Sequence, residues 1–140
     1  MELRLSVPGK FDRLEQISRF IEQAGYEAGL DQTAVSRCQL AVDEACTNII
    51  EHAYQGEGHG NIDICCEPEQ GELTIIIEDQ GKPFDPNSVP APQLNTNLED
   101  MQVGGLGLYF IRKVMDAVEF TYEHGSNKLV LVKRREGEGE

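Results

Sequence analysis

Residues 73–81 read LTIIIEDQG, and this stretch decides the fold because it joins a buried strand to a polar strand end. Three consecutive isoleucines at residues 75–77 are typical of a strand that is buried on both faces. The run ends at Asp79, and Gly81 follows. A carboxylate at a strand end can accept a hydrogen bond from an exocyclic amino group, and a glycine lets a flat ring approach the backbone. A turn with Asx chemistry is the alternative interpretation.

The chain before this strand predicts two further strands and two helices. They are expected at residues 3–7, 11–25, 31–54 and 62–66. Alternating apolar residues indicate the strands, and apolar residues at intervals of three and four indicate the helices. Asp31 can cap the second helix, since its side chain can accept a hydrogen bond from a backbone N–H of the first turn. The strands on either side of Gly71 form a hairpin.

The chain after Asp79 predicts a long irregular segment, a helix and two strands. Residues 80–103 contain four prolines and no period, which favours a functional lid over a passive connection. A helix containing Leu108 and Ile111 follows, and then two strands joined around Gly125. We therefore expect one domain of the α/β class. Residues 1–134 would form this single domain, and residues 135–140 a charged, frayed tail.

Composition restricts the compartment and the partners. The chain has 12 Lys and Arg against 25 Asp and Glu, a net charge of −13, which disfavours nucleic acid and anionic lipid and favours basic protein surfaces. No apolar run approaches the roughly 20 residues that cross a bilayer, and the N-terminus lacks a signal-peptide core. The four cysteines lack C-x-x-C spacing, which indicates free thiols and not a zinc site. We expect a cytoplasmic protein without membrane contact.

The second predicted helix carries a polar face with candidate site residues. Glu44, Asn48 and His52 are spaced four residues apart, so they fall on one side of the helix together with Glu51. An amide next to carboxylates offers the oxygen ligands that Mg²⁺ takes when it also holds phosphate oxygens. A solvated helix face is the alternative interpretation.

Residues 104–108 read GGLGL at the start of the third predicted helix. Backbone N–H groups and the positive end of the helix dipole favour phosphate at such a position. A tight turn would use the same glycines. The segment lacks the Lys-Ser/Thr ending of a P-loop, and no Rossmann order of elements surrounds it, which excludes two common nucleotide folds.

Taken in order, these three segments resemble the N, G1 and G2 boxes of the GHKL ATPase superfamily. The closer resemblance is to the anti-sigma factor serine/threonine kinases of bacteria. It is carried by residues 43–48, 79–86, 104–108 and 127–133. The resemblance covers nearly the whole chain, from the first strand to about Arg134. It implies a two-layer α/β sandwich of the GHKL type, with one mixed, mostly antiparallel sheet that helices cover on one face. It also implies ATP and Mg²⁺ as cofactors.

The resemblance also implies a role for each motif residue. Asn48 would bind the nucleotide and coordinate Mg²⁺, Asp79 would bind the adenine amino group, and Gly81 would line the base. Phe84 belongs to the same cofactor-binding set. Gly105 and Gly107 would contact the phosphates, and Gly104, Leu106 and Leu108 belong to the same cofactor-binding set. Glu44 would be the general base that takes the proton of an attacking hydroxyl.

The implied activity is phosphorylation of Ser or Thr on an anti-anti-sigma protein, with sequestration of a sigma factor in another state. Direct contact with nucleic acid is not expected. Relatives in this superfamily dimerise through the sheet, and the alternation at Leu3, Leu5 and Val7 could present such an edge. A homodimer is therefore possible.

One departure from the family pattern keeps a second function open. Between Pro83 and Val103 there is no Lys or Arg, so the predicted lid offers no cation to the γ-phosphate. Lys82, Arg112 and Lys128 are the remaining candidates. The departure favours a module that binds ATP and a partner without phosphotransfer.

Two further interpretations are weaker. A stand-alone histidine-kinase catalytic domain is disfavoured, because the first 30 residues contain no two-helix bundle with a phosphoacceptor histidine. An unrelated α/β domain is disfavoured because three motifs in the family order are jointly more specific than each alone.

Overall fold

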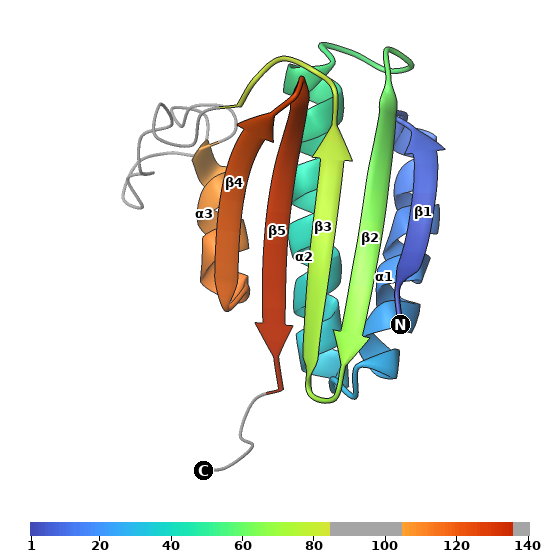
Figure 1. The fold of residues 1–140 in the computed structure, drawn as a ribbon, viewed down its shortest axis with the longest axis vertical. Coiled ribbons are helices and arrows are strands. Elements are labelled where there is room, and N and C mark those ends of the chain that lie inside the picture. The colour runs from blue at the N-terminus through green and yellow to red at the C-terminus, as the bar shows by residue number, and fades with distance from the viewer. Residues whose placement is uncertain (85–104, 136–140) are drawn as a thin grey trace.

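The structure is a computed structural model, and it describes residues 1–84 and 105–135. Five strands form one sheet, and helices cover its rear face (Figure 1). The strands are β1 (Leu3–Pro8), β2 (Asn61–Glu69), β3 (Glu72–Asp79), β4 (Ala117–Glu123) and β5 (Ser126–Arg134). The helices are α1 (Leu14–Glu27), α2 (Gln32–Asn48) and α3 (Gly105–Val114), with a 3₁₀ turn η1 (Phe11–Arg13) and a π-helical turn η2 (Ile49–Ala53). The predicted α/β sandwich is confirmed.

The strand order is β1-β2-β3-β5-β4, and all four pairings are antiparallel. We expected a mixed sheet, and that detail is wrong among the described strands. β3 and β4 run in the same direction (Figure 1), but the hairpin from β4 returns β5 into the position between them. No parallel neighbours therefore arise.

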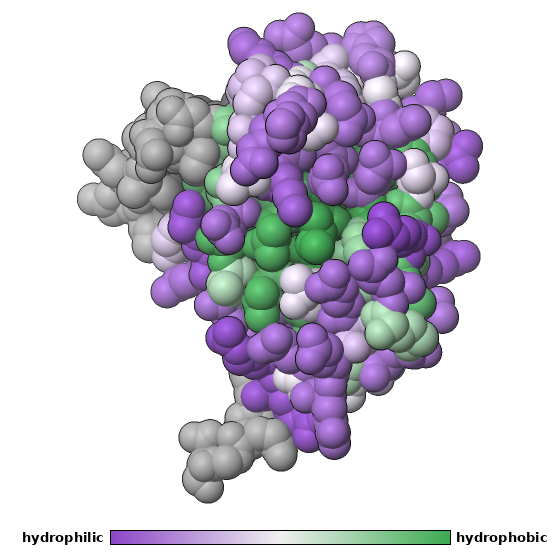
Figure 2. Space-filling model, viewed as in Figure 1, coloured by the Kyte–Doolittle hydropathy of each residue, from purple (hydrophilic) through white to green (hydrophobic). Residues whose placement is uncertain are grey.

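The helices leave the front face of the sheet open. In β3, Leu73, Ile75 and Ile77 are buried toward the helices, whereas Ile76 is only half-buried on the open face. The prediction that this strand is buried on both faces is therefore wrong. Ile76 lies between Cys65 and Val130 in the sheet register. Figure 2 shows the result, an apolar centre surrounded by hydrophilic residues.

The second helix begins and packs as the sequence predicts. Asp31 accepts a hydrogen bond from the backbone N–H of Ala34 at 2.8 Å, and the predicted apolar stripe of α2 is buried. Instead of continuing as an α-helix to residue 54, the helix ends in the π turn η2. At the other end of the chain, the backbone N–H of Arg135 donates to the carbonyl of Gly71 at 2.8 Å, so the chain is still attached to the sheet there. None of the described helices combines the length and the apolar character that crossing a membrane requires.

Candidate functional site

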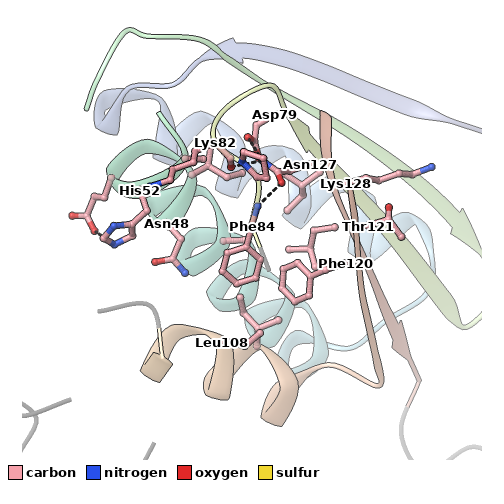
Figure 3. Close-up of a pocket in the computed structure, with 18 of the residues that line it drawn as sticks. Asn48, His52, Asp79, Lys82, Phe84, Leu108, Phe120, Thr121, Asn127 and Lys128 are labelled. Carbon is pink, nitrogen blue, oxygen red and sulfur yellow. Dashed lines mark hydrogen bonds and ion pairs between the residues drawn. The ribbon is translucent and has the colours of Figure 1, made fainter. Parts of the chain in front are cut away.

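A cavity of about 350 Å³ lies where the end of α2 meets the end of β3, the start of β5 and α3. Its apolar wall includes Ile49, Ile77, Leu108, Phe120 and Leu129. The polar groups that line it include Asn48, Glu51, His52, Asp79, Lys82, Asn127 and Lys128 (Figure 3). An apolar concavity with a few convergent polar groups is the usual form of a small-molecule site.

Asp79 is the buried carboxylate of this cavity, with only 4% of its surface exposed. Its Oδ1 accepts hydrogen bonds from the backbone N–H of Gly81 at 2.9 Å and from Nδ2 of Asn127 at 3.0 Å. No described residue donates to Oδ2. Burial raises the pKa of Asp79, and the two hydrogen bonds oppose this rise. The side chain therefore offers one unused acceptor to the cavity.

The backbone at Gly81 lies against the end of η2. A Cβ at position 81 would lie 2.5 Å from the carbonyl oxygen of Ala53, and the N–H of Lys82 donates to that same carbonyl at 2.8 Å. The absence of a side chain is thus required by this close approach. Gly81 is not among the residues that line the cavity, and its contact with a base stays a prediction.

Asn127 is a site residue that our sequence reasoning did not single out. It lies directly opposite Asp79 in the β3–β5 register. Its Nδ2 donates to Asp79 and also to the carbonyl of Lys82 at 2.9 Å, and its Oδ1 accepts from the N–H of Phe84 at 2.9 Å. The alternation with Leu129 places position 127 on the inward face, and an amide there was the available signal.

Two aromatic rings form one wall of the cavity. Phe84 packs on Phe120 of β4, with ring centroids 4.9 Å apart and planes inclined by 45°. Phe84, a predicted site residue, is 37% exposed, and both rings line the cavity (Figure 3). Such a pair gives a planar group an apolar surface to pack against.

The end of α2 brings only part of its predicted polar face to the cavity. Asn48, Glu51 and His52 line it, whereas Glu44 is not among the described lining residues. The π turn, in which the N–H of Tyr54 donates to the carbonyl of Ile49 at 2.9 Å, changes the spacing beyond Asn48. Burial, and next the carboxylates of Asp43 and Glu51, raise the pKa of Glu44.

The predicted phosphate side is described in part. Gly105, Leu106 and Gly107 form the first turn of α3, and Leu108 lines the cavity. Gly104 and the predicted lid beyond Phe84 lie outside the described residues. Of the three candidate cations, Lys82 lines the cavity, Lys128 borders it but directs its side chain away (Figure 3), and Arg112 is exposed on α3.

Known proteins match this chain over most of its length. The family described as histidine kinase-like ATPase domain matches residues 7–133. The chain is similar to the serine-protein kinase RsbW of Listeria innocua, with 28% identity over 128 residues that cover 89% of this chain and 82% of that protein. The serine-protein kinase RsbW of a Bacillus cereus strain is 29% identical over 133 residues, which cover 92% of this chain and 82% of that protein.

Two solved structures share the fold. The RsbU and RsbW domains of Rv1364c from Mycobacterium tuberculosis match with a TM-score of 0.67 and 15% identity, over 96% of this chain and 32% of that chain. The catalytic domain of the histidine kinase ThkA matches with a TM-score of 0.56 and 13% identity, over 95% of this chain and 96% of that chain. The fold neighbours agree with the family match, which spans nearly the whole chain. The chain therefore belongs to the histidine kinase-like ATPase domain family.

Proposed function

We propose that this chain is an ATP-dependent serine/threonine-protein kinase that phosphorylates an anti-anti-sigma protein and, in another state, sequesters a sigma factor. The observation that carries this proposal is the buried Asp79 carboxylate, whose Oδ2 is free of described donors at the edge of an apolar cavity. The family match and the relatives named serine-protein kinase RsbW support the same activity. Residues 1–134 would be the working domain, which would act in the cytoplasm and could form a homodimer.

The cavity's residues fit an adenine nucleotide. Asp79 Oδ2 would accept a hydrogen bond from the exocyclic amino group, and the rings of Phe84 and Phe120 would pack against the base. The volume of about 350 Å³ lies within the usual range for small-molecule sites. The backbone N–H groups at the start of α3, at Gly105 and Gly107, would receive phosphate oxygens.

The amide of Asn48 would supply an oxygen ligand to Mg²⁺, because hard divalent cations prefer oxygen donors. Bound Mg-ATP supplies the phosphoryl group and the metal charge that stabilises its transfer. Lys82, which lines the cavity, would add positive charge near the phosphates, whereas the side chain of Lys128 points away from the cavity toward the open face of the sheet (Figure 3).

Glu44 would act as the base for the partner's hydroxyl. It would accept the hydroxyl proton as that oxygen attacks the γ-phosphorus and ADP departs. The raised pKa of Glu44 suits this role, since a base is most effective when its pKa is close to the working pH. The net charge of −13 suits a partner with a basic docking surface.

A binding module without phosphotransfer is the second candidate function. It is favoured by the position of Glu44, which is not among the described lining residues, and by the absence of Lys and Arg between Pro83 and Val103. In this case the chain would bind ATP and a partner protein, and its negative charge would contribute only to binding the partner.

One assay separates the two functions. A pulldown with the chain as bait identifies the anti-anti-sigma protein, which is then incubated with the chain, Mg²⁺ and γ-labelled ATP. Label on a Ser or Thr of the partner establishes the kinase. Tight binding of both ATP and partner with no label establishes the binding module, and failure to bind ATP would refute both.

A further inference from the structure

Asn127, the second residue of β5, makes hydrogen bonds to two parts of the site at once. Its Nδ2 donates to Asp79 Oδ1 at 3.0 Å and to the carbonyl of Lys82 at 2.9 Å, while its Oδ1 accepts from the N–H of Phe84 at 2.9 Å (Figure 3). The orientation of the amide is fixed, because the flipped amide would face donor with donor and acceptor with acceptor. Only 8% of Asn127 is exposed, so little water competes with these bonds.

We propose that Asn127 is a positioning residue that sets the selectivity of the site for bases with an exocyclic amino group. It holds Oδ1 of Asp79 and thereby leaves Oδ2 for the ligand, and it holds the backbone that carries Phe84 against Phe120. One side chain thus orients both the carboxylate that would accept a hydrogen bond from the base and the aromatic wall that would pack against the base. This inference rests on the proposed nucleotide-binding function.

The chemistry of the three bonds requires an amide. A carboxylate at position 127 could still accept from the N–H of Phe84, but it would present an acceptor to Asp79 and to the carbonyl of Lys82. An apolar side chain would remove all three bonds, and the loss is most costly at Asp79, where the bond is buried, whereas the bonds to Lys82 and Phe84 are part-buried. Substitutions at position 127 can therefore separate the contact with Asp79 from the contact with the N–H of Phe84.

The neighbouring Ser126 provides a matched control. Its hydroxyl accepts a hydrogen bond from Nε2 of Gln80 at 3.3 Å, so it also connects β5 to the residues after β3. This contact is exposed and touches neither Asp79 nor Phe84. Loss of the Ser126 hydroxyl should therefore leave the selectivity of the site unchanged.

The protonation of Asp79 gives a second readout. Burial raises the pKa of Asp79 and the bond from Asn127 lowers it, so loss of this bond should move the acid limit of nucleotide binding to higher pH. Other titratable groups also face Asp79 or line the cavity with it. They are Cys46 of α2, Tyr54, Glu51, His52, Lys82 and Lys128. Asn127→Ala keeps all of them and adds no titratable group, so a shift of its acid limit reports on the lost bond, whereas Asn127→Asp places a second carboxylate beside Asp79 and is not used for this readout.

The selectivity is tested by calorimetry with ADP and IDP, since IDP lacks the exocyclic amino group. The parent should prefer ADP, and Asn127→Ala and Asn127→Asp should reduce that preference roughly tenfold, which corresponds to about 1.4 kcal/mol. Ser126→Ala should keep the parental ratio. An equal loss of affinity for both nucleotides, with the ratio and the acid limit unchanged, would show that Asn127 is merely structural and would overturn the proposal.

Backbone amide exchange tests the second half of the role in the ligand-free protein. The N–H of Phe84 should exchange faster in Asn127→Ala, and it should stay protected in Asn127→Asp because the introduced carboxylate still accepts its hydrogen bond. If thermal melting shows that the alanine variant is unfolded, the nearly isosteric Asn127→Asp still decides the selectivity. Parental protection of Phe84 in a folded Asn127→Ala would overturn the proposal. If the parent binds neither nucleotide, the proposed function fails, while the exchange of Phe84 still judges the positioning role.

Discussion

Replacing Asp79 by asparagine should weaken adenine nucleotide binding while the fold is retained. Two donors, the N–H of Gly81 and Nδ2 of Asn127, hold Oδ1 at 2.9 and 3.0 Å. In Asp79→Asn the amide oxygen must occupy this position, so the new NH₂ group takes the place of Oδ2. The exocyclic amino group of a base would then meet a donor. We expect a loss of about 1 to 3 kcal/mol, or roughly 5- to 150-fold in affinity, from the lost charge-assisted hydrogen bond.

The same substitution should not destabilise the ligand-free protein. Because burial raises the pKa of Asp79 in the folded chain, its contribution to stability is fully present below the unfolded pKa and is lost as the pH rises through the folded pKa. At neutral pH the neutral amide of Asp79→Asn should therefore melt at the parental temperature or above it. Glu78→Gln is the matched control, since it removes a charge from the neighbouring residue of β3, on the open face.

Calorimetry with Mg-ATP on the parent and both variants, together with melting curves, decides the matter. We expect weak binding by Asp79→Asn and parental binding by Glu78→Gln. If Asp79→Asn binds ATP as tightly as the parent, the assignment of Oδ2 as the acceptor for the base is refuted. If it binds weakly only because it has unfolded, the melting curve will show it.

Three further predictions concern the neighbouring residues. Asn48→Ala should abolish the Mg²⁺-dependent part of ATP affinity at an unchanged melting temperature without ligand, and a retained Mg-ATP shift in melting would remove Asn48 from the site. Glu44→Gln should keep ATP and partner binding while the rate of phosphotransfer falls by about 10²- to 10⁴-fold. In the parent, the transfer rate should decline as the pH falls through the raised pKa of Glu44, and this decline should be absent in the variant. Equal transfer rates would exclude Glu44 as the base. Gly81→Ala should destabilise the fold by about 1 to 3 kcal/mol in urea unfolding, because its Cβ would lie 2.5 Å from the carbonyl of Ala53, and parental stability would contradict that contact.

Features set by neighbouring residues could be predicted from the sequence. Asp31 caps α2 because the cap needs only the backbone of the next turn. Asp79 ends β3, and the turn at Gly71, with φ +83, closes the hairpin before it. Each of these features depends on a period or on a turn residue within a short window, which is the range over which pattern reasoning works.

Features set by distant residues could not be predicted from the sequence. The contact between Asp79 and Asn127 joins positions 48 residues apart, and it follows from a strand register that the sequence does not state. Three isoleucines in a row allow burial on both faces, but Ile76 faces the open side because the helices cover one face only. The π turn at the end of α2 likewise arises where the helix end meets the loop at Gly81, and no local signal marks it.

Residues 80–84, which follow β3, are held by hydrogen bonds from the sheet and from the end of the α2–η2 helix. The hydroxyl of Tyr54 donates to the carbonyl of Asn61 at 2.6 Å and accepts from the N–H of Gln80 at 2.9 Å. The carbonyl of Ala53 accepts a hydrogen bond from the N–H of Lys82. Asn127 donates to Asp79 before this segment and accepts from the N–H of Phe84 at its end. Each of these hydrogen-bond partners belongs to the sheet or to the end of the α2–η2 helix, so the conformational entropy of this segment is lost during folding and not on binding. A ligand that meets Asp79 therefore loses less free energy to rearrangement than it would at a loose loop, and the Asp79 end is the preorganised part of the cavity.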